Sequence, residues 1–261
     1  MPPTNVSRMS RTLMLLVVLL AALYLALCAA LFVFQRALIY YPQPRADASA
    51  PLLTLAVDDE QIMVSTRPHA GPKALIYFGG NAEDVSRSLP AFAAAFPDDA
   101  LYFLHYRGYG GSSGSPSEEA IARDAMALFD KVYADHPRIT LVGRSLGSGV
   151  AVRLASARPA AKLLLVTPYD SVEALAARQF RWFPVQWLLT DKFESWRYAE
   201  HISVPTRLIA AEQDEVIPAS STRRLLSHFQ EGVATLRVIA GTGHNSISDS
   251  PEYLRLLGDD L

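Results

Sequence analysis

The apolar residues of this chain form one long run near the N-terminus, followed by many shorter runs. The long run, Leu13 to Phe34, holds 22 residues without a charge, enough for a helix to cross a hydrocarbon layer of ~30 Å. It is longer than the apolar core of a cleavable signal peptide and contains no A-x-A cleavage pattern. We therefore predict a transmembrane anchor at 13–34, preceded by a basic flank at 1–12.

A linker is expected after the anchor, at 35–51, where the sequence changes from aromatic to rich in proline and alanine. Tyr40 and Tyr41 are predicted to lie at the membrane interface, where tyrosine is enriched. The residues after them are predicted to be extended. One domain should then occupy 52–261.

The charges beside the anchor indicate its orientation. Arg8 and Arg11, with the amino terminus, precede the anchor, and Arg36 and Arg45 follow it. This comparison favours a cytoplasmic N-terminus and a domain outside the cytoplasm. Cys28 is the one cysteine and lies inside the anchor, so the domain has no internal disulfide. A lipid on Cys28 stays a minor alternative, because leucine precedes it where a lipoprotein signal needs a small residue.

The shorter apolar runs alternate with helical patterns, as they do in parallel sheets with crossover helices. An opening hairpin of edge strands is expected at 52–57 and 62–66. Further strands are expected at 74–78, 101–104, 139–142, 163–166, 206–210 and 235–239, and helices at 82–96, at 117–134 and directly after residue 145. The pattern predicts an α/β fold with a mostly parallel sheet of about eight strands and helices on both faces.

An insertion of roughly forty residues separates the strands at 163–166 and 206–210, more than a plain crossover helix needs. Its stretch 178–193 is crowded with large apolar side chains. One interpretation is a short amphipathic helix packed on the sheet as ordinary core. The other is a small helical lid, with Trp182, Phe183 and Trp187 lining a pocket for an acyl chain.

Composition excludes one class of partner. The chain has 261 residues, half of them hydrophobic, and a formal net charge of −2. No basic stripe with interleaved aromatic residues occurs, so we expect no nucleic-acid partner.

Candidate chemistry begins at Gly143-Arg144-Ser145-Leu146-Gly147, which fits the G-x-S-x-G elbow. Glycines permit a strained strand-to-helix turn, and the serine hydroxyl stands exposed at its apex. The same pattern recurs at 110–114 around Ser112, but in a polar loop with no helix directly behind it. We therefore predict Ser145 as the nucleophile and the backbone N–H of Leu146 as an oxyanion donor.

A nucleophilic serine needs a histidine base and a carboxylate that orients it, in the chain order serine, acid, histidine for this architecture. Asp214 follows the strand at 206–210, and His244 follows the last strand. Because the carboxyl ends of parallel strands share one sheet edge, the three side chains should converge. Glu212 remains the substitute for Asp214. This chemistry needs neither a metal nor a cofactor, and we predict none.

A second oxyanion donor is expected where the first core strand meets its helix, at Gly79-Gly80-Asn81. The backbone N–H of Asn81 is the candidate. Asn81 is also a candidate N-cap for the helix expected at 82–96, and the two roles are compatible.

Together these features resemble the α/β-hydrolase superfamily, especially the small membrane-anchored serine hydrolases that include bacterial YfhR-like proteins and eukaryotic protein depalmitoylases. The matching stretches are the anchor with Phe34-Gln35-Arg36-Ala37-Leu38-Ile39-Tyr40-Tyr41-Pro42, then Gly80-Asn81-Ala82, 106–114, the Ser145 elbow, Asp214 and His244. Gly79 departs from the family, because many relatives carry histidine there, so the shape of the oxyanion loop is expected to differ.

The resemblance implies a single-pass protein of the bacterial inner membrane that cleaves an ester or thioester through an acyl-enzyme on Ser145. Its substrate would be a small molecule or an acyl-bearing lipid or protein. Two alternatives stay open: a serine peptidase of the same fold, and a degenerate hydrolase that serves as a membrane-tethered binding module. The complete triad argues against the second alternative.

Overall fold

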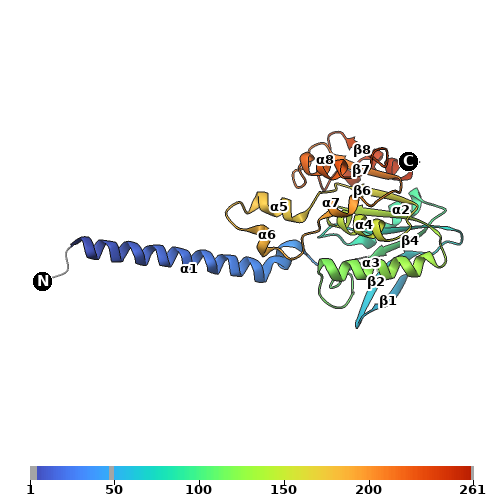
Figure 1. Cartoon of the computed structure of the whole chain (residues 1–261). Helices are drawn as coiled ribbons and strands as arrows, with labels where there is room; N and C mark the ends of the chain where they lie inside the picture. The colour runs from blue at the N-terminus through green and yellow to red at the C-terminus, as the bar shows by residue number, and fades with distance from the viewer. Residues whose placement is uncertain (1–4, 47–49, 260–261) are drawn as a thin grey trace.

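Helix α1 (Asn5–Ile39) projects away from the rest of the molecule (Figure 1). The computed structural model describes residues 5–46 and 50–259, so parts of the predicted flank, linker and domain, at 1–4, 47–49 and 260–261, lie outside the described residues. Within α1, the segment Met9–Ile39 contains an 18-residue window with a mean hydropathy of 2.9 and is long and apolar enough to cross a membrane.

The helix continues past the predicted anchor, to Ile39, and takes up the first residues of the expected linker. Leucine, alanine, glutamine and arginine in this stretch favour helix, and Pro42 disfavours its continuation. Tyr40 is only 4% exposed and donates a hydrogen bond to the Asp191 carboxylate at 2.9 Å. The prediction of an interfacial Tyr40 was therefore wrong, because its hydroxyl finds a partner inside the domain.

Eight strands form a single sheet in the order β1-β2-β4-β3-β5-β6-β7-β8. They are β1 (Leu52–Val57), β2 (Glu60–Arg67), β3 (Lys73–Phe78), β4 (Ala100–Leu104), β5 (Arg138–Arg144), β6 (Lys162–Val166), β7 (Thr206–Ala211) and β8 (Ala234–Ile239). β2 is antiparallel to both β1 and β4, and the remaining pairs are parallel. The predicted fold class is confirmed, but of the two expected edge strands only β1 lies at the edge.

Helices cover both faces of the sheet (Figure 1). One face packs against α3 (Glu118–Tyr133), α4 (Leu146–Ala157), α7 (Ser195–Ala199) and α8 (Ala219–Ser227). The other packs against α2 (Leu89–Ala95) and α9 (Pro251–Gly258). Alternation along β3 explains the two layers, because Ile76 and Phe78 belong to the first cluster and Leu75 and Tyr77 to the second.

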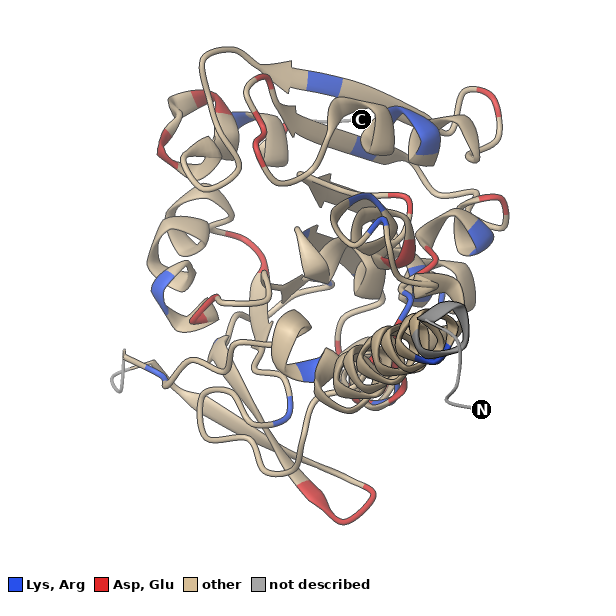
Figure 2. Ribbon diagram, turned by 90° about the vertical axis from the view of Figure 1, so that its left-hand side faces the viewer, with Lys and Arg blue, Asp and Glu red and all other residues tan. Residues whose placement is uncertain are grey.

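Two expected helices are broken into shorter pieces. The helix predicted at 82–96 is a 3-10 turn, η1 (Val85–Arg87), followed by α2, which has a proline in its first turn. The insertion holds α5 (Val172–Gln179) and the one-turn helix α6 (Val185–Leu188), with α7 behind them, and η2 (Ile247–Asp249) precedes α9. Acidic and basic residues are interspersed around the domain, seen with α1 pointing toward the reader (Figure 2).

The turn from β5 into α4 is strained and tightly packed. Ser145 has φ 50° and ψ −119°, in the region that side chains rarely adopt. Gly147 permits this turn, because a Cβ there would collide with the carbonyl oxygen of Phe78 at the end of β3. Gly143 is equally confined, against the carbonyl oxygen of Gly147. Helix α4 can therefore begin directly over the sheet edge, with Ser145 at its tip.

We predict that Gly147→Ala lowers the free energy of unfolding by about 1–3 kcal/mol, the usual cost of overpacking. The Phe78 carbonyl lies in the sheet and cannot move aside. Thermal unfolding of the full chain in detergent, followed by circular dichroism, measures the change. Gly258→Ala is the matched control, because a Cβ there meets nothing within 4 Å. Equal melting temperatures for the two variants would contradict the tight approach of α4 to β3.

Candidate active site

Three side chains from loops after different strands form a hydrogen-bonded chain. The Ser145 hydroxyl lies 3.0 Å from Nε2 of His244. The other ring nitrogen, Nδ1, lies 3.1 and 3.0 Å from the two carboxylate oxygens of Asp214. The side chains of His244 and Asp214 are each 7% exposed, so water screens their attraction poorly. The structure thus brings together the three residues that the sequence singled out for this chemistry.

Backbone amides hold the carboxylate of Asp214 in place. The amides of Val216 and Ile217 donate to its Oδ1 at 2.9 and 2.7 Å. Glu212, the substitute considered for this position, instead accepts from the amide of Gly241 at 2.8 Å. Asp214 is therefore the acid that contacts the histidine, and Glu212 shapes the loop that carries it.

The second G-x-S-x-G match has a different environment. Ser112 is buried, donates to the carbonyl of His105 at 2.8 Å and accepts from the amide of Met63 at 2.8 Å. The ring of His105 lies 2.8 Å from the hydroxyl of Ser65. Burial lowers the pKa of His105 to about 4. The contacts of Ser112 with Met63 and of His105 with Ser65 fasten the loop after β4 to the neighbouring strand β2.

The loop after β3 passes close to the elbow. A Cβ on Gly80 would lie 3.7 Å from Cβ of Ser145, at ordinary contact distance. The amide of Gly80 donates to the Glu83 carboxylate at 2.8 Å. Glu83 also pairs with Arg144 at 3.0 Å, beside the serine. This ion pair joins the two loops around Ser145. Sequence reasoning missed it, although a charged residue inside the elbow was a visible signal.

Asn81 is held by the end of α1. Its side-chain amide donates to the carbonyl of Ile39 at 2.8 Å. Its own carbonyl accepts from the amide of Tyr41 at 3.0 Å and from the hydroxyl of Tyr109 at 2.6 Å. The expected N-cap role of Asn81 was wrong, because the first helical turn begins later and Asp84 caps it. The side chain of Asn81 instead connects the loop after β3 to the last residue of α1, a contact that we call the joint.

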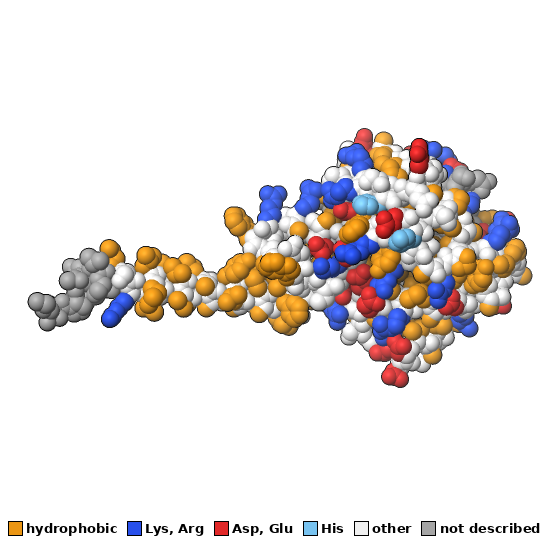
Figure 3. Space-filling model, in the orientation of Figure 1, with side chains coloured by type: hydrophobic (Ala, Val, Ile, Leu, Met, Phe, Trp, Pro, Cys, Tyr) orange, Lys and Arg blue, Asp and Glu red, His pale blue; other side chains and the backbone are white. Residues whose placement is uncertain are grey.

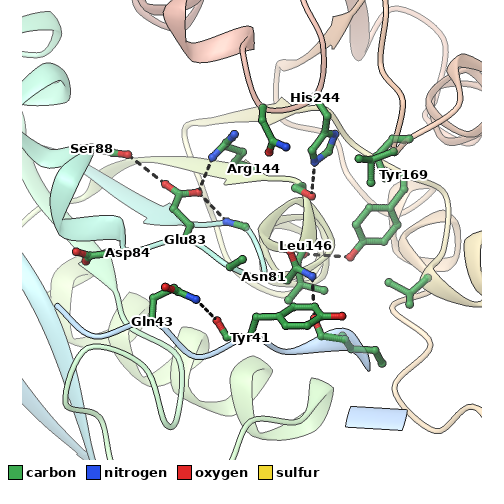
Figure 4. A pocket seen from close by; sticks show the side chains of 18 of the residues that line it. Tyr41, Gln43, Asn81, Glu83, Asp84, Ser88, Arg144, Leu146, Tyr169 and His244 are labelled. Carbon is green, nitrogen blue, oxygen red and sulfur yellow. Dashed lines mark hydrogen bonds and ion pairs between the residues drawn. The ribbon is translucent and has the colours of Figure 1, made fainter. Parts of the chain in front are cut away.

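A cavity of about 910 Å³ opens beside Ser145 and His244. Figure 4 shows polar side chains on one side of it and apolar ones on the other. The polar part is lined by Gln43, Glu83, Asp84, Arg87, Ser88 and Arg144. The apolar part is lined by Leu38, Ile39, Tyr41, Leu146, Tyr169, Val172, Leu175, Val216 and Ile217. Ser145 and His244 therefore lie where the polar and the apolar parts of the lining meet.

Solved structures share this architecture. An α/β-hydrolase enzyme from a deep-sea metagenome library superimposes with a TM-score of 0.65 at 16% identity, covering 80% of this chain and 98% of that one. Mouse α/β hydrolase domain-containing protein 10 gives 0.61 at 17% identity, covering 80% and 95%. This chain has the α/β-hydrolase fold.

Sequence relatives extend the comparison. An uncharacterised protein of Mycobacterium tuberculosis is 33% identical over 238 residues, covering 84% of this chain and 82% of that protein, and this chain belongs to its family. The lysophosphatidylserine lipase ABHD12 of Macaca fascicularis is 31% identical over 186 residues, covering 60% of this chain. The match spans only 46% of that lipase. No protein-family model matches the chain.

The aromatic residues predicted to line the pocket lie elsewhere in the structure. Trp182 and Trp187 are 87% and 78% exposed, and neither they nor Phe183 borders the cavity. The prediction of a lid over Ser145 was wrong for these three residues. The ring of Phe183 stacks on Tyr24 of α1, with 5.7 Å between ring centroids, so this part of the insertion packs against α1 and not over the elbow. The insertion reaches the cavity through α5 and the loop before it.

Tyr109→Phe tests the joint between α1 and the loop after β3, which carries Asn81, the predicted oxyanion donor. The variant removes one hydroxyl that bonds both Tyr41 and Asn81. Loss of a whole oxyanion donor costs 10²–10³ in kcat, and a displaced donor should cost less, about 10-fold. We therefore expect kcat for a water-soluble ester to fall about 10-fold.

The matched control is Tyr133→Phe, which removes a hydroxyl from an exposed tyrosine of α3 and should leave kcat unchanged. Turnover is compared well below the melting temperature of each variant, so that lost stability does not enter the rate. Unchanged kcat in Tyr109→Phe would show that the joint is only a packing contact.

Proposed function

We propose that this α/β hydrolase is a membrane-anchored serine esterase that acts through an acyl-enzyme on Ser145. The observation that carries the proposal is the hydrogen-bonded chain from Ser145 through His244 to Asp214, with links of 3.0 to 3.1 Å. A base within this distance of a serine hydroxyl can accept its proton during attack on a carbonyl carbon. Carboxylic esters and thioesters are the bonds that suit this chemistry.

In the proposed reaction, the Ser145 oxygen attacks the carbonyl carbon and its proton moves to Nε2 of His244. Asp214 stays ionised, holds the Nδ1–H tautomer and stabilises the imidazolium. The carbonyl oxygen becomes an anion, for which the backbone N–H groups of Leu146 and Asn81 are the proposed donors. His244 then protonates the leaving group. Water, activated by the same histidine, releases the acid and restores Ser145.

The divided lining of the cavity supports a substrate with one apolar chain and a polar head group. Its volume of about 910 Å³ lies within the usual range for pockets that enclose a small organic ligand. The ABHD12 relatives are lysophosphatidylserine lipases, and a lysophospholipid has one apolar chain and a polar head group. We propose a single-chain lipid ester as the substrate class, with the acyl chain in the apolar part and the head group beside Arg87 and Gln43.

The proposed location is the bacterial inner membrane, with α1 as the anchor and the domain outside the cytoplasm. The length and hydropathy of α1 support the anchor. The charges beside the apolar run support the orientation, since Arg8, Arg11 and the amino terminus precede it and Arg36 and Arg45 follow it.

Ser145→Ala should abolish covalent labelling by a fluorophosphonate probe, because the attacking oxygen is removed and alanine still fits the turn. Labelling of the full chain in detergent, read on a gel and by mass spectrometry of the labelled peptide, measures this. A series of esters, thioesters and amides with the wild-type chain then identifies the bond that is cleaved.

Ser112→Ala is the matched control, since Ser112 stands in the same five-residue pattern. It should label at the wild-type rate. Loss of labelling in Ser112→Ala, with retention in Ser145→Ala, would assign the nucleophile to the other loop and refute the proposed mechanism.

Leu175→Ala tests the acyl side of the cavity. Leu175 is half-buried on α5 and lines the apolar part. Shortening it removes apolar contacts with a long chain worth about 1–2 kcal/mol, or roughly 5- to 30-fold in kcat/KM. An acetyl ester does not reach this residue and should be unaffected. Leu226→Ala on α8, equally half-buried but outside the cavity, is the control. Equal losses on short and long chains would place the acyl group elsewhere.

A further inference from the structure

The two most exposed large apolar side chains among the described residues stand in one turn of the insertion. They are Trp182 and Trp187, at 87% and 78% exposure. We call residues 180–189 the tryptophan turn. Figure 3 shows hydrophobic side chains continuing from α1 onto the adjoining edge of the domain. Exposed tryptophan is costly in water but is enriched at the membrane–water interface, where its ring is amphipathic.

The tryptophan turn contacts α1 at two positions along the helix. Near the middle of α1, the hydroxyl of Tyr24 donates to the carbonyl of Trp182 at 2.9 Å, and its ring stacks on Phe183 at 5.7 Å. Near the C-terminal end of α1, the side-chain amide of Gln35 donates to the carbonyl of Leu188 at 3.0 Å. The turn therefore runs beside α1 from Tyr24 to Gln35, next to the apolar surface of that helix.

Helix geometry gives the depth of this contact in a bilayer. Arg11 is the last charge before the apolar run, so the hydrocarbon core begins after it. A core of ~30 Å takes ~20 residues of helix, which places its other edge near Phe32. Tyr24 then lies up to about 12 Å inside that edge, at ~1.5 Å per residue. Gln35 lies just outside it.

We infer that the tryptophan turn is a second membrane-contacting element, which dips into the same leaflet from which α1 emerges toward the domain. This inference rests on the proposed insertion of α1. Trp182, bound at the level of Tyr24, lies below the edge of the hydrocarbon, and Trp187 lies near the edge. The exposed Arg178 and Arg181 both precede Trp182 in the chain, and long side chains of this kind can reach back toward lipid phosphates. The domain is therefore seated on the membrane in one orientation.

Tryptophan fluorescence tests the inference, because the chain has three tryptophans. Full-length chains that each retain one are reconstituted in phosphatidylcholine–phosphatidylglycerol vesicles with bromine at shallow or deep acyl positions. W187F/W196F retains Trp182, W182F/W196F retains Trp187, and W182F/W187F retains Trp196. We expect bromolipid to quench at least half of the Trp182 and Trp187 emission, with the deeper label more effective on Trp182.

Trp196 supplies the internal control, because it packs on His228 in the domain at 5.5 Å between ring centroids. Its emission should respond little to bromolipid and more to aqueous acrylamide. Flotation with vesicles is measured on every chain. If a chain floats with the vesicles but only acrylamide quenches the emission of Trp182 and Trp187, the inference is overturned and the anchor stands. A chain that does not float overturns both the anchor and the inference, without bearing on the triad.

Discussion

The backbone at Ser145 is held in a conformation that costs about 1–3 kcal/mol in an ordinary residue, and the neighbouring contacts maintain it. The amide of Ser145 donates to the carbonyl of Val166 at 2.9 Å, and the hydroxyl of Ser148 donates to the Ser145 carbonyl at 2.7 Å. Gly147 lies against the carbonyl of Phe78. Three parallel strands thus determine where the serine hydroxyl stands. The rest of the site is arranged around this point, because the loop after the adjacent strand β3 and His244, after the edge strand β8, both reach it.

The end of helix α1 and the two residues after it are bound to the domain at two places. At one, Ile39 and Tyr41 hold Asn81, the proposed oxyanion donor. At the other, the guanidinium of Arg36 and the hydroxyl of Tyr40 both contact the Asp191 carboxylate, at 3.2 and 2.9 Å. Asp191 is buried, so breaking these contacts would leave its charge poorly compensated. The proposed anchor and the proposed catalytic geometry therefore depend on some of the same hydrogen bonds.

Local pattern was sufficient for the sheet and for the elbow, because strand periodicity and confined glycines are properties of short stretches. It also located Asp214 and His244, since each follows a strand in a parallel sheet. It failed where a residue's partner lies far away in the chain. Trp182 meets Tyr24 at a separation of 158 residues, and Glu83 meets Arg144 at a separation of 61. No local pattern states which apolar surface an aromatic segment will face.

The position of the apolar part of the cavity bears on how a lipid ester would reach Ser145. Leu38 and Ile39 line it, and they follow the apolar run of α1 by little more than one helical turn. Moving an acyl chain from the bilayer into water costs about 0.8 kcal/mol per CH₂, roughly 8 kcal/mol for ten such groups. A path along α1, from the leaflet to the apolar lining, would avoid most of this cost. With α1 as the proposed anchor, a joint that places its end in the cavity wall would thus favour substrates that are already in the membrane over those dissolved in water.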